Sequence, residues 1–183
     1  MKVSLSHVKH IANKIAVDLN RSSVITMTRG LDAVAEEAEK HLIENVKKEM
    51  ALEEKVYEIV DENEEQIDFY LADERQLFFM IKKKLAEEFG VILNYEERFS
   101  DLAHTILDNL YEEDLIHYDV NENRIKNIIY DAITGFVADT NEIESAVIER
   151  LRSYTRKLIP GTDEYEILYE KHYQEELQKR GMA

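Results

Sequence analysis

The chain has 183 residues, of which 44% are hydrophobic and 34% are charged, and its formal net charge is −16. A chain of this length forms one medium domain or two small ones, and its negative charge disfavours binding to phosphate backbones and anionic membranes. It contains no cysteine, which excludes a disulfide framework, a thiolate zinc site and a cysteine nucleophile.

Long amphipathic helices are the expected structure, because one proline and five glycines leave few positions that interrupt a helix. Ser6 and Thr28 are placed to cap the first two helices, and we place a bend or break near Met50, where the periodicity shifts. Gly90 is expected to stop the fourth helix. The apolar positions of these four helices are Val8, Ile11, Ala12, Ile15 and Leu19; Leu31, Val34, Ala35, Ala38, Leu42 and Val46; Leu52, Val56, Ile59, Val60 and Ile67; and Phe78, Ile81, Leu85 and Phe89.

The second half of the chain repeats this pattern at a constant shift. Asn94 and Glu97 have the spacing of a capping box. The apolar residues that follow are Phe99, Leu102, Ala103, Ile106 and Leu110. Subtracting 91 from their numbers gives 8, 11, 12, 15 and 19, the apolar positions of the first helix. The register continues without a gap to Gly181, which falls on Gly90.

Such a repeat indicates an ancient internal duplication. We therefore predict an all-α fold of two similar helical halves, an N-terminal repeat at residues 1–91 and a C-terminal repeat at residues 92–183. Each half offers amphipathic helices whose apolar faces need partners. Because pairing the halves buries these faces, we expect one continuous structural unit with a shared core.

The last helix carries the clearest start and stop signals. Pro160-Gly161 marks a turn, Thr162 or Asp163 is placed to cap the helix, and Gly181 follows its end. Four of its residues share one face: Tyr165, Tyr169, His172 and Tyr173. The simplest interpretation is a packed stripe with the phenol oxygens at its rim. The alternatives are a partner-binding face with His172 at its centre and a catalytic Tyr–His pair, although no nucleophile or metal set accompanies such a pair.

A specific residue pattern also ends the chain. It comprises Pro160-Gly161, Glu164, Tyr165, Ile167-Leu168-Tyr169, Tyr173, Glu175-Glu176-Leu177 and Arg180-Gly181, with a looser pattern at Val3-Ser4-Leu5-Ser6. In these residues the chain resembles the bacterial family known as domain of unknown function 507. The resemblance implies an all-helical fold, an antiparallel four-helix base with two projecting helical arms. It implies no activity, because none is assigned to the family.

Other candidate sites are few. His7 and His10 lie three residues apart and form a weak candidate metal pair, for which ordinary surface histidines are the simpler interpretation. Lys82-Lys83-Lys84 is the one basic cluster, and it is either a solvated edge or a phosphate contact. The acidic run Asp61-Glu62-Asn63-Glu64-Glu65 is typical of a solvated helix face. Glycine-rich phosphate loops, nucleophile elbows and Glu-x-x-His motifs do not occur, so we predict no catalytic, cofactor-binding or metal-binding residues.

We therefore expect a soluble, cytoplasmic, non-catalytic helical protein that acts as a protein-interaction or scaffold module. The N-terminus lacks the apolar core of a secretory signal, and no apolar run reaches the roughly 20 residues that span a bilayer. The expected partner is a macromolecule, protein rather than nucleic acid, and the chain is expected to be a monomer or weak homodimer without a cofactor. Two alternatives stay open: a nucleic-acid-associated regulator, acting through Lys82-Lys83-Lys84 or a basic protein partner, and a metal-using enzyme.

Overall fold

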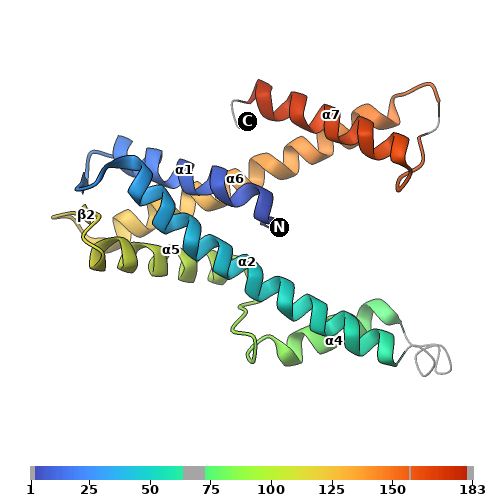
Figure 1. Ribbon diagram of the computed structural model, residues 1–183, viewed down its shortest axis with the longest axis horizontal. Helices are drawn as coiled ribbons and strands as arrows, with labels where there is room; N and C mark the ends of the chain where they lie inside the picture. Colours follow the sequence, from blue (N-terminus) through green and yellow to red (C-terminus); the bar gives the residue numbers. More distant parts are fainter. Residues whose placement is uncertain (1–2, 64–72, 157, 181–183) are drawn as a thin grey trace.

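The computed structural model describes residues 3–63, 73–156 and 158–180. Within these ranges the chain forms six helices and one ribbon of two short strands, so the predicted all-α fold is confirmed (Figure 1). In chain order the elements are α1 (Leu5–Arg21), β1 (Thr26–Met27), α2 (Gly30–Glu62), α4 (Glu74–Leu85), α5 (Tyr95–Glu112), β2 (Ile116–His117), α6 (Glu122–Arg152) and α7 (Asp163–Lys179).

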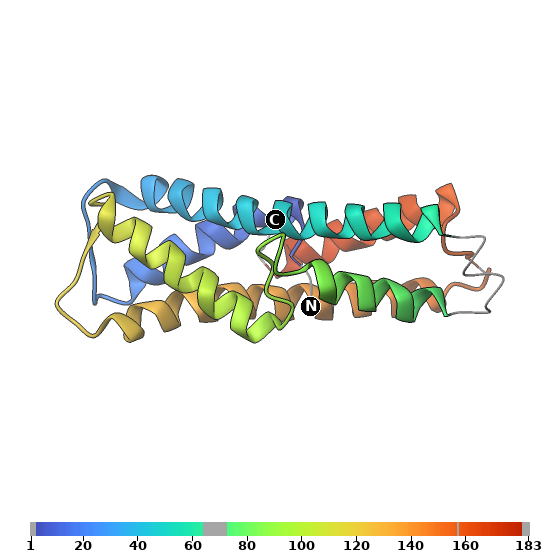
Figure 2. The same ribbon diagram turned by 90° about the horizontal axis from the view of Figure 1, so that it is seen from below.

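Four helices form a base at one end of the molecule. Helices α1 and α5 pack against α2 and α6, and each of the two contacts both long helices (Figures 1 and 2). The apolar faces of the four helices meet in one core that takes residues from both halves of the chain. Its largest fully buried side chains are Ile11, Ile15, Leu19, Leu42, Ile106, Leu107, Leu110, Ile116, Ile125, Ile129 and Ile133.

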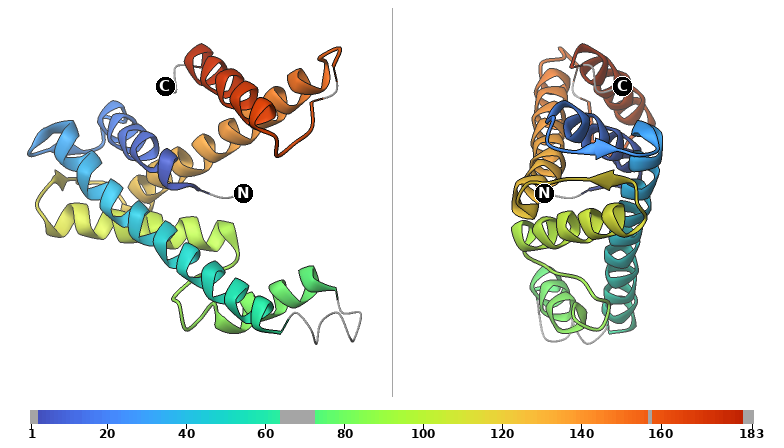
Figure 3. Two further views of the ribbon diagram at one scale, coloured as in Figure 1. Left: turned by 45° about the vertical axis from the view of Figure 1, so that its right-hand side comes forward. Right: turned by 90° about the vertical axis from the view of Figure 1, so that its left-hand side faces the viewer.

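Beyond the base, α2 and α6 diverge into two arms, and each is covered by a shorter helix that folds back along it (Figure 3). In the N-terminal arm, α4 packs on α2 around Leu52, Val56 and Val60. In the C-terminal arm, α7 packs on α6 around a cluster that comprises Ile143, Val147, Leu151 and Leu177. The four-helix base with two arms, implied by the family resemblance, is therefore confirmed.

Each long helix runs through base and arm without interruption, and the bend or break predicted near Met50 is wrong. The apolar series loses phase there because its next member, Glu49, is polar. That side chain is nevertheless buried, with 3% of its surface exposed. Thr140 is the equivalent residue of α6 (140 minus 91 is 49), and its hydroxyl donates to the Phe136 carbonyl at 2.9 Å.

The helix starts agree only in part with the sequence signals. Helix α1 begins directly after Ser4, not after Ser6. Thr28 does not cap α2, because its hydroxyl donates to the carbonyl of Asp114. The predicted cap at Asn94 is confirmed, since its side-chain oxygen accepts the backbone N–H groups of residues 96 and 97 at 2.9 and 3.2 Å.

Three sequence predictions fall on residues outside the described ranges: the third-helix position Ile67, the end of the acidic run at Glu64-Glu65, and the stop at Gly181. Among the helices that the structure does describe, none has the length and apolarity needed to cross a membrane.

Two local features recur at the predicted shift of 91 residues. Ser23 and Asp114 (114 minus 91 is 23) both have a φ of 56°, a conformation that residues other than glycine seldom adopt. Thr26 pairs with His117 across the ribbon (117 minus 91 is 26), so two equivalent positions face each other. This register fits an approximate twofold axis between the halves. The descent of both halves from one duplicated ancestor, and the boundary between residues 91 and 92, stay predictions.

A proline substitution tests the continuity of α2. Met50 is 47% exposed, so Met50→Ala should change the free energy of unfolding by no more than about 0.5 kcal/mol. Met50→Pro removes a helical hydrogen bond and should cost roughly 3 kcal/mol or more, measured by urea unfolding followed by circular dichroism. Equal stabilities of the two variants would contradict an uninterrupted helix at this position.

Candidate interaction site on the C-terminal arm

The candidate site is built on α7. The chain turns at Gly161, and the Thr162 hydroxyl then caps the helix by accepting the N–H of Tyr165 at 3.4 Å. The rings of Tyr165, Tyr169 and Tyr173 stack in succession, with centroids 6.3 and 6.0 Å apart and interplanar angles of 20° and 13°. These three residues, the tyrosine ladder, are half-buried because they pack against the arm core on one side.

His172 does not lie on the accessible side of the ladder. It is 2% exposed, and its Nε2 lies 2.9 Å from the hydroxyl of Tyr154. Its Nδ1 lies 3.2 Å from a carboxylate oxygen of Glu175, which also accepts from Arg150 at 2.8 Å. The hydrogen bond from His172, together with Arg150, lowers the pKa of Glu175. His172, which was predicted to be the centre of a partner-binding face, is therefore a buried residue that lies behind that face.

The tyrosine ladder instead meets the histidine pair of α1. The hydroxyl of Tyr173 lies 2.9 Å from Nε2 of His7. The rings of His7 and His10 both pack on Phe136, with centroids 5.8 and 6.3 Å away. The candidate metal pair is thus engaged with an aromatic ring at the point where α7 joins the base.

Two hollows follow the ladder along α7. The junction hollow, of about 320 Å³, lies where the arm meets the base, and its lining comprises Ser6, His7, His10, Phe136, Glu170, Tyr173, Gln174 and Leu177. The arm hollow, of about 500 Å³, is lined by Gly161, Tyr165, Glu166, Tyr169 and Glu170. Glu170 belongs to both, so they form one face. That face carries carboxylates and aromatic rings, and none of the described residues that line it is a lysine or an arginine.

Glu144 of α6 acts on this face electrostatically. Burial raises the pKa of Tyr173 to about 12, and the negative charge of Glu144 adds to the effect. The same two causes raise the pKa of Tyr169. Burial lowers the pKa of His7; Glu144 opposes this shift and His10 reinforces it. The hydroxyls of Tyr169 and Tyr173 therefore stay protonated at neutral pH.

The N-terminal arm joins the base through charged groups. The Arg98 guanidinium lies 2.7 Å from Glu49 and also donates to Asn45 at 2.7 and 3.1 Å. Lys82 lies 2.8 Å from Glu53 and 3.4 Å from Glu49. This junction network is largely buried. In the basic cluster predicted at residues 82–84, Lys82 is therefore engaged by carboxylates, whereas Lys83 and Lys84 are exposed.

Sequence reasoning missed one group with metal-ligand geometry. Within the described residues, His104, Asp108 and Glu122 place ligand atoms within 4.8 Å of one another. His104 Nδ1 lies 3.3 Å from Glu122 and its Nε2 lies 3.6 Å from Asp108. All three side chains are about half exposed, as surface ion pairs commonly are. The i,i+4 spacing of His104 and Asp108 was the only signal in the sequence.

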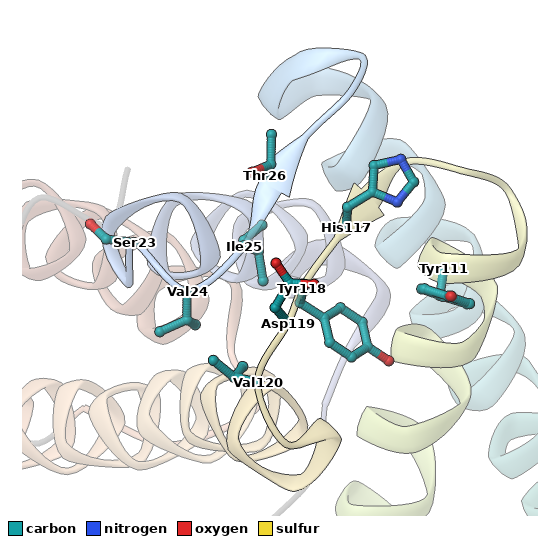
Figure 4. A pocket seen from close by; sticks show the side chains of 9 residues that line it. All are labelled: Ser23, Val24, Ile25, Thr26, Tyr111, His117, Tyr118, Asp119 and Val120. Carbon is teal, nitrogen blue, oxygen red and sulfur yellow. The ribbon is translucent and has the colours of Figure 1, made fainter.

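A further hollow of about 560 Å³ lies at the ribbon end of the base (Figure 4). It is lined by residues 23–26 and 117–120 together with Tyr111. The Tyr118 ring lies 5.4 Å from that of Tyr111. Burial raises the pKa of Tyr118. This hollow marks the contact between the two halves.

Fold and geometry together define an all-α protein with a four-helix base, two arms and an acidic aromatic face on one arm. Over residues 1–182 the chain matches the family described as Protein of unknown function (DUF507), and it belongs to that family. The resemblance inferred from its ending is thereby confirmed. No curated protein matches the sequence.

The junction network should respond differently to single and double substitutions. Arg98→Met leaves Glu49 buried without its closest cation and should lower the free energy of unfolding by about 3–5 kcal/mol. Combining it with Glu49→Leu removes both charges and should recover most of that loss, because Lys82 still has its salt bridge to Glu53. Urea unfolding of both variants measures the difference; an Arg98→Met variant as stable as the wild type would contradict the network.

Acid should weaken the contact between His7 and Tyr173. Because the folded state lowers the pKa of His7 below 6.5, the unfolded chain binds more protons once the pH falls below that value. The contribution of the neutral His7 side chain to the free energy of unfolding is complete above pH 6.5. It is lost as the pH falls toward the pKa that His7 has in the folded state. Between about pH 7.5 and 5.5 the wild type should lose more unfolding free energy than His7→Gln. Equal losses of unfolding free energy in the wild type and in His7→Gln would contradict the assignment.

Proposed function

We propose that this protein is a non-catalytic interaction module that binds a protein partner through the tyrosine ladder of α7. One observation carries the proposal: three stacked tyrosines, held by the arm core on one side, line two hollows on the other. The arm projects from a base whose core is complete without it. The fold can therefore present this face without exposing its own core.

The physical character of the ladder suits recognition of a protein. Tyrosine offers a large contact area with only two rotatable side-chain bonds, so little conformational entropy is lost on binding. The stacking at 6.0 and 6.3 Å and the Tyr173–His7 contact restrict the rings further. Such pre-organised aromatic residues commonly supply most of the binding energy of an interface.

The other two candidate functions have less support. A nucleic-acid-associated role through the lysine cluster would use Lys82, whose ammonium is engaged by Glu53 at 2.8 Å. The metal-using alternative would rest on the exposed group around His104. Neither of these sites combines a hollow with pre-arranged rings.

Site-directed photo-crosslinking tests the proposal. The photoreactive residue p-benzoylphenylalanine replaces Glu166, which lines the arm hollow, or Lys171, which is exposed on the opposite side of α7. We expect one protein to be crosslinked from position 166 and not from position 171. That protein, once purified, should bind the wild-type chain directly.

The matched substitutions are Tyr169→Ala and Tyr169→Phe. The alanine variant removes a ring and should weaken binding of the purified partner about 10-fold or more, measured by calorimetry. The phenylalanine variant keeps the ring and should bind nearly as well as the wild type. Crosslinks that form equally from both positions, or affinity unchanged by Tyr169→Ala, would rule out the ladder as the interface.

A further inference from the structure

The two arm junctions use equivalent positions with different chemistry. Subtracting 91 places Tyr173 on Lys82 and Glu144 on Glu53. It also makes His7 the residue equivalent to Arg98, since 98 minus 91 is 7. In the N-terminal junction Lys82 lies 2.8 Å from Glu53. In the C-terminal junction Tyr173 instead contacts His7 at 2.9 Å, and the negative charge of Glu144 acts on Tyr173. The same positions thus meet at both junctions through different contacts.

The N-terminal junction supplies its own cations. Glu53 has the ammonium of Lys82, and Glu49 has the guanidinium of Arg98 at 2.7 Å. A carboxylate that is partly or fully desolvated in this way is costly unless a positive charge lies beside it. In the N-terminal arm that condition is met within the chain.

At the equivalent positions of the C-terminal junction the carboxylate is kept, but the lysine and the arginine are not. A tyrosine replaces the lysine and a histidine replaces the arginine at the equivalent positions. Across the described residues, Glu144, Glu166 and Glu170 form no salt bridge. Other glutamates of the same arm are paired: Glu142 with Arg180 at 2.9 Å and Glu175 with Arg150 at 2.8 Å.

We propose that the junction hollow binds a lysine or arginine side chain of the protein partner, whose charge takes the place that Lys82 has in the other arm. This inference rests on the proposed interaction through α7. Glu170 lines the hollow together with Tyr173, and the negative charge of Glu144, which acts on Tyr173, adds to that of Glu170. A volume of about 320 Å³ is at the low end of the roughly 300–1,000 Å³ of small-ligand sites, which suits one side chain.

A titration with small probes tests the inference without the partner. The probes are N-acetylarginine amide and N-acetyllysine amide. The control is N-acetylcitrulline amide, which has the shape of the arginine compound without its charge. Chemical shifts of His7, Tyr169 and Tyr173 are followed by nuclear magnetic resonance. We expect saturable shifts with both cations and none with citrulline, and the shifts should weaken as salt is added.

Two variants locate the charge. Glu144→Gln should weaken binding of the arginine probe about 10-fold, while Glu149→Gln, an exposed residue of the same helix, should leave it unchanged. Tyr173→Lys places an ammonium at the position equivalent to Lys82 and should abolish probe binding, with the helical circular dichroism signal retained.

The outcomes separate this inference from the proposed function. Equal shifts with citrulline, no saturable shifts at His7 and Tyr173, or full binding to Glu144→Gln would each overturn the cation site. A partner that still crosslinks from position 166 in the Glu144→Gln background, with undiminished affinity, would also overturn it and leave the interaction through the ladder standing.

Discussion

Helices α2 and α6 each run without interruption from the core of the base into the core of an arm. The buried face of each helix therefore belongs to two cores, and the rest of the architecture depends on the continuity of these two helices. Val46 lies in the base core and Leu52 in the core of the N-terminal arm, on the same uninterrupted helix. A helix of this length bends little, so the packing of the base sets the direction of each arm. Helices α4 and α7 have only to cover the outer part of that buried face. A polar residue, Glu49 or Thr140, occupies the transition between the cores.

The periodicity of apolar residues was sufficient to predict the helices, because a buried face must recur at every third or fourth position. It failed at residue 49, since the burial of Glu49 depends on Arg98 and Lys82, which are distant in sequence. The spacing of the tyrosines also predicted their shared face. It gave no indication that Tyr173 would meet His7, 166 residues away, or that His172 would turn toward Tyr154. Contacts of this range arise from the fold and leave no local pattern.

The two junctions use positions related by the shift of 91 residues but have opposite electrostatic character. A buried ion network carries a large desolvation cost, and its attraction offsets that cost only when each charge has well-placed partners. Arg98 meets this condition by contacting Glu49 and Asn45 together, which ties α5 to α2 in one register. The His7–Tyr173 contact is neutral and avoids the cost. The carboxylate of Glu144, at the position equivalent to Glu53, forms no salt bridge among the described residues.

This asymmetry is the reason that we propose the C-terminal arm as the one that binds a partner. In that proposal the ladder supplies contact area and shape, and the carboxylates select the sign of the charge that enters. Binding there also couples to the fold, because Tyr173 contacts His7 of α1 and thereby links α7 to the base. A ligand that binds only when this contact is formed stabilises the folded protein by RT ln(1 + [L]/Kd), where [L] is its free concentration. The occupant of the junction hollow would therefore stabilise the C-terminal arm as Lys82 stabilises the N-terminal one, with the difference that its contribution depends on the partner's concentration.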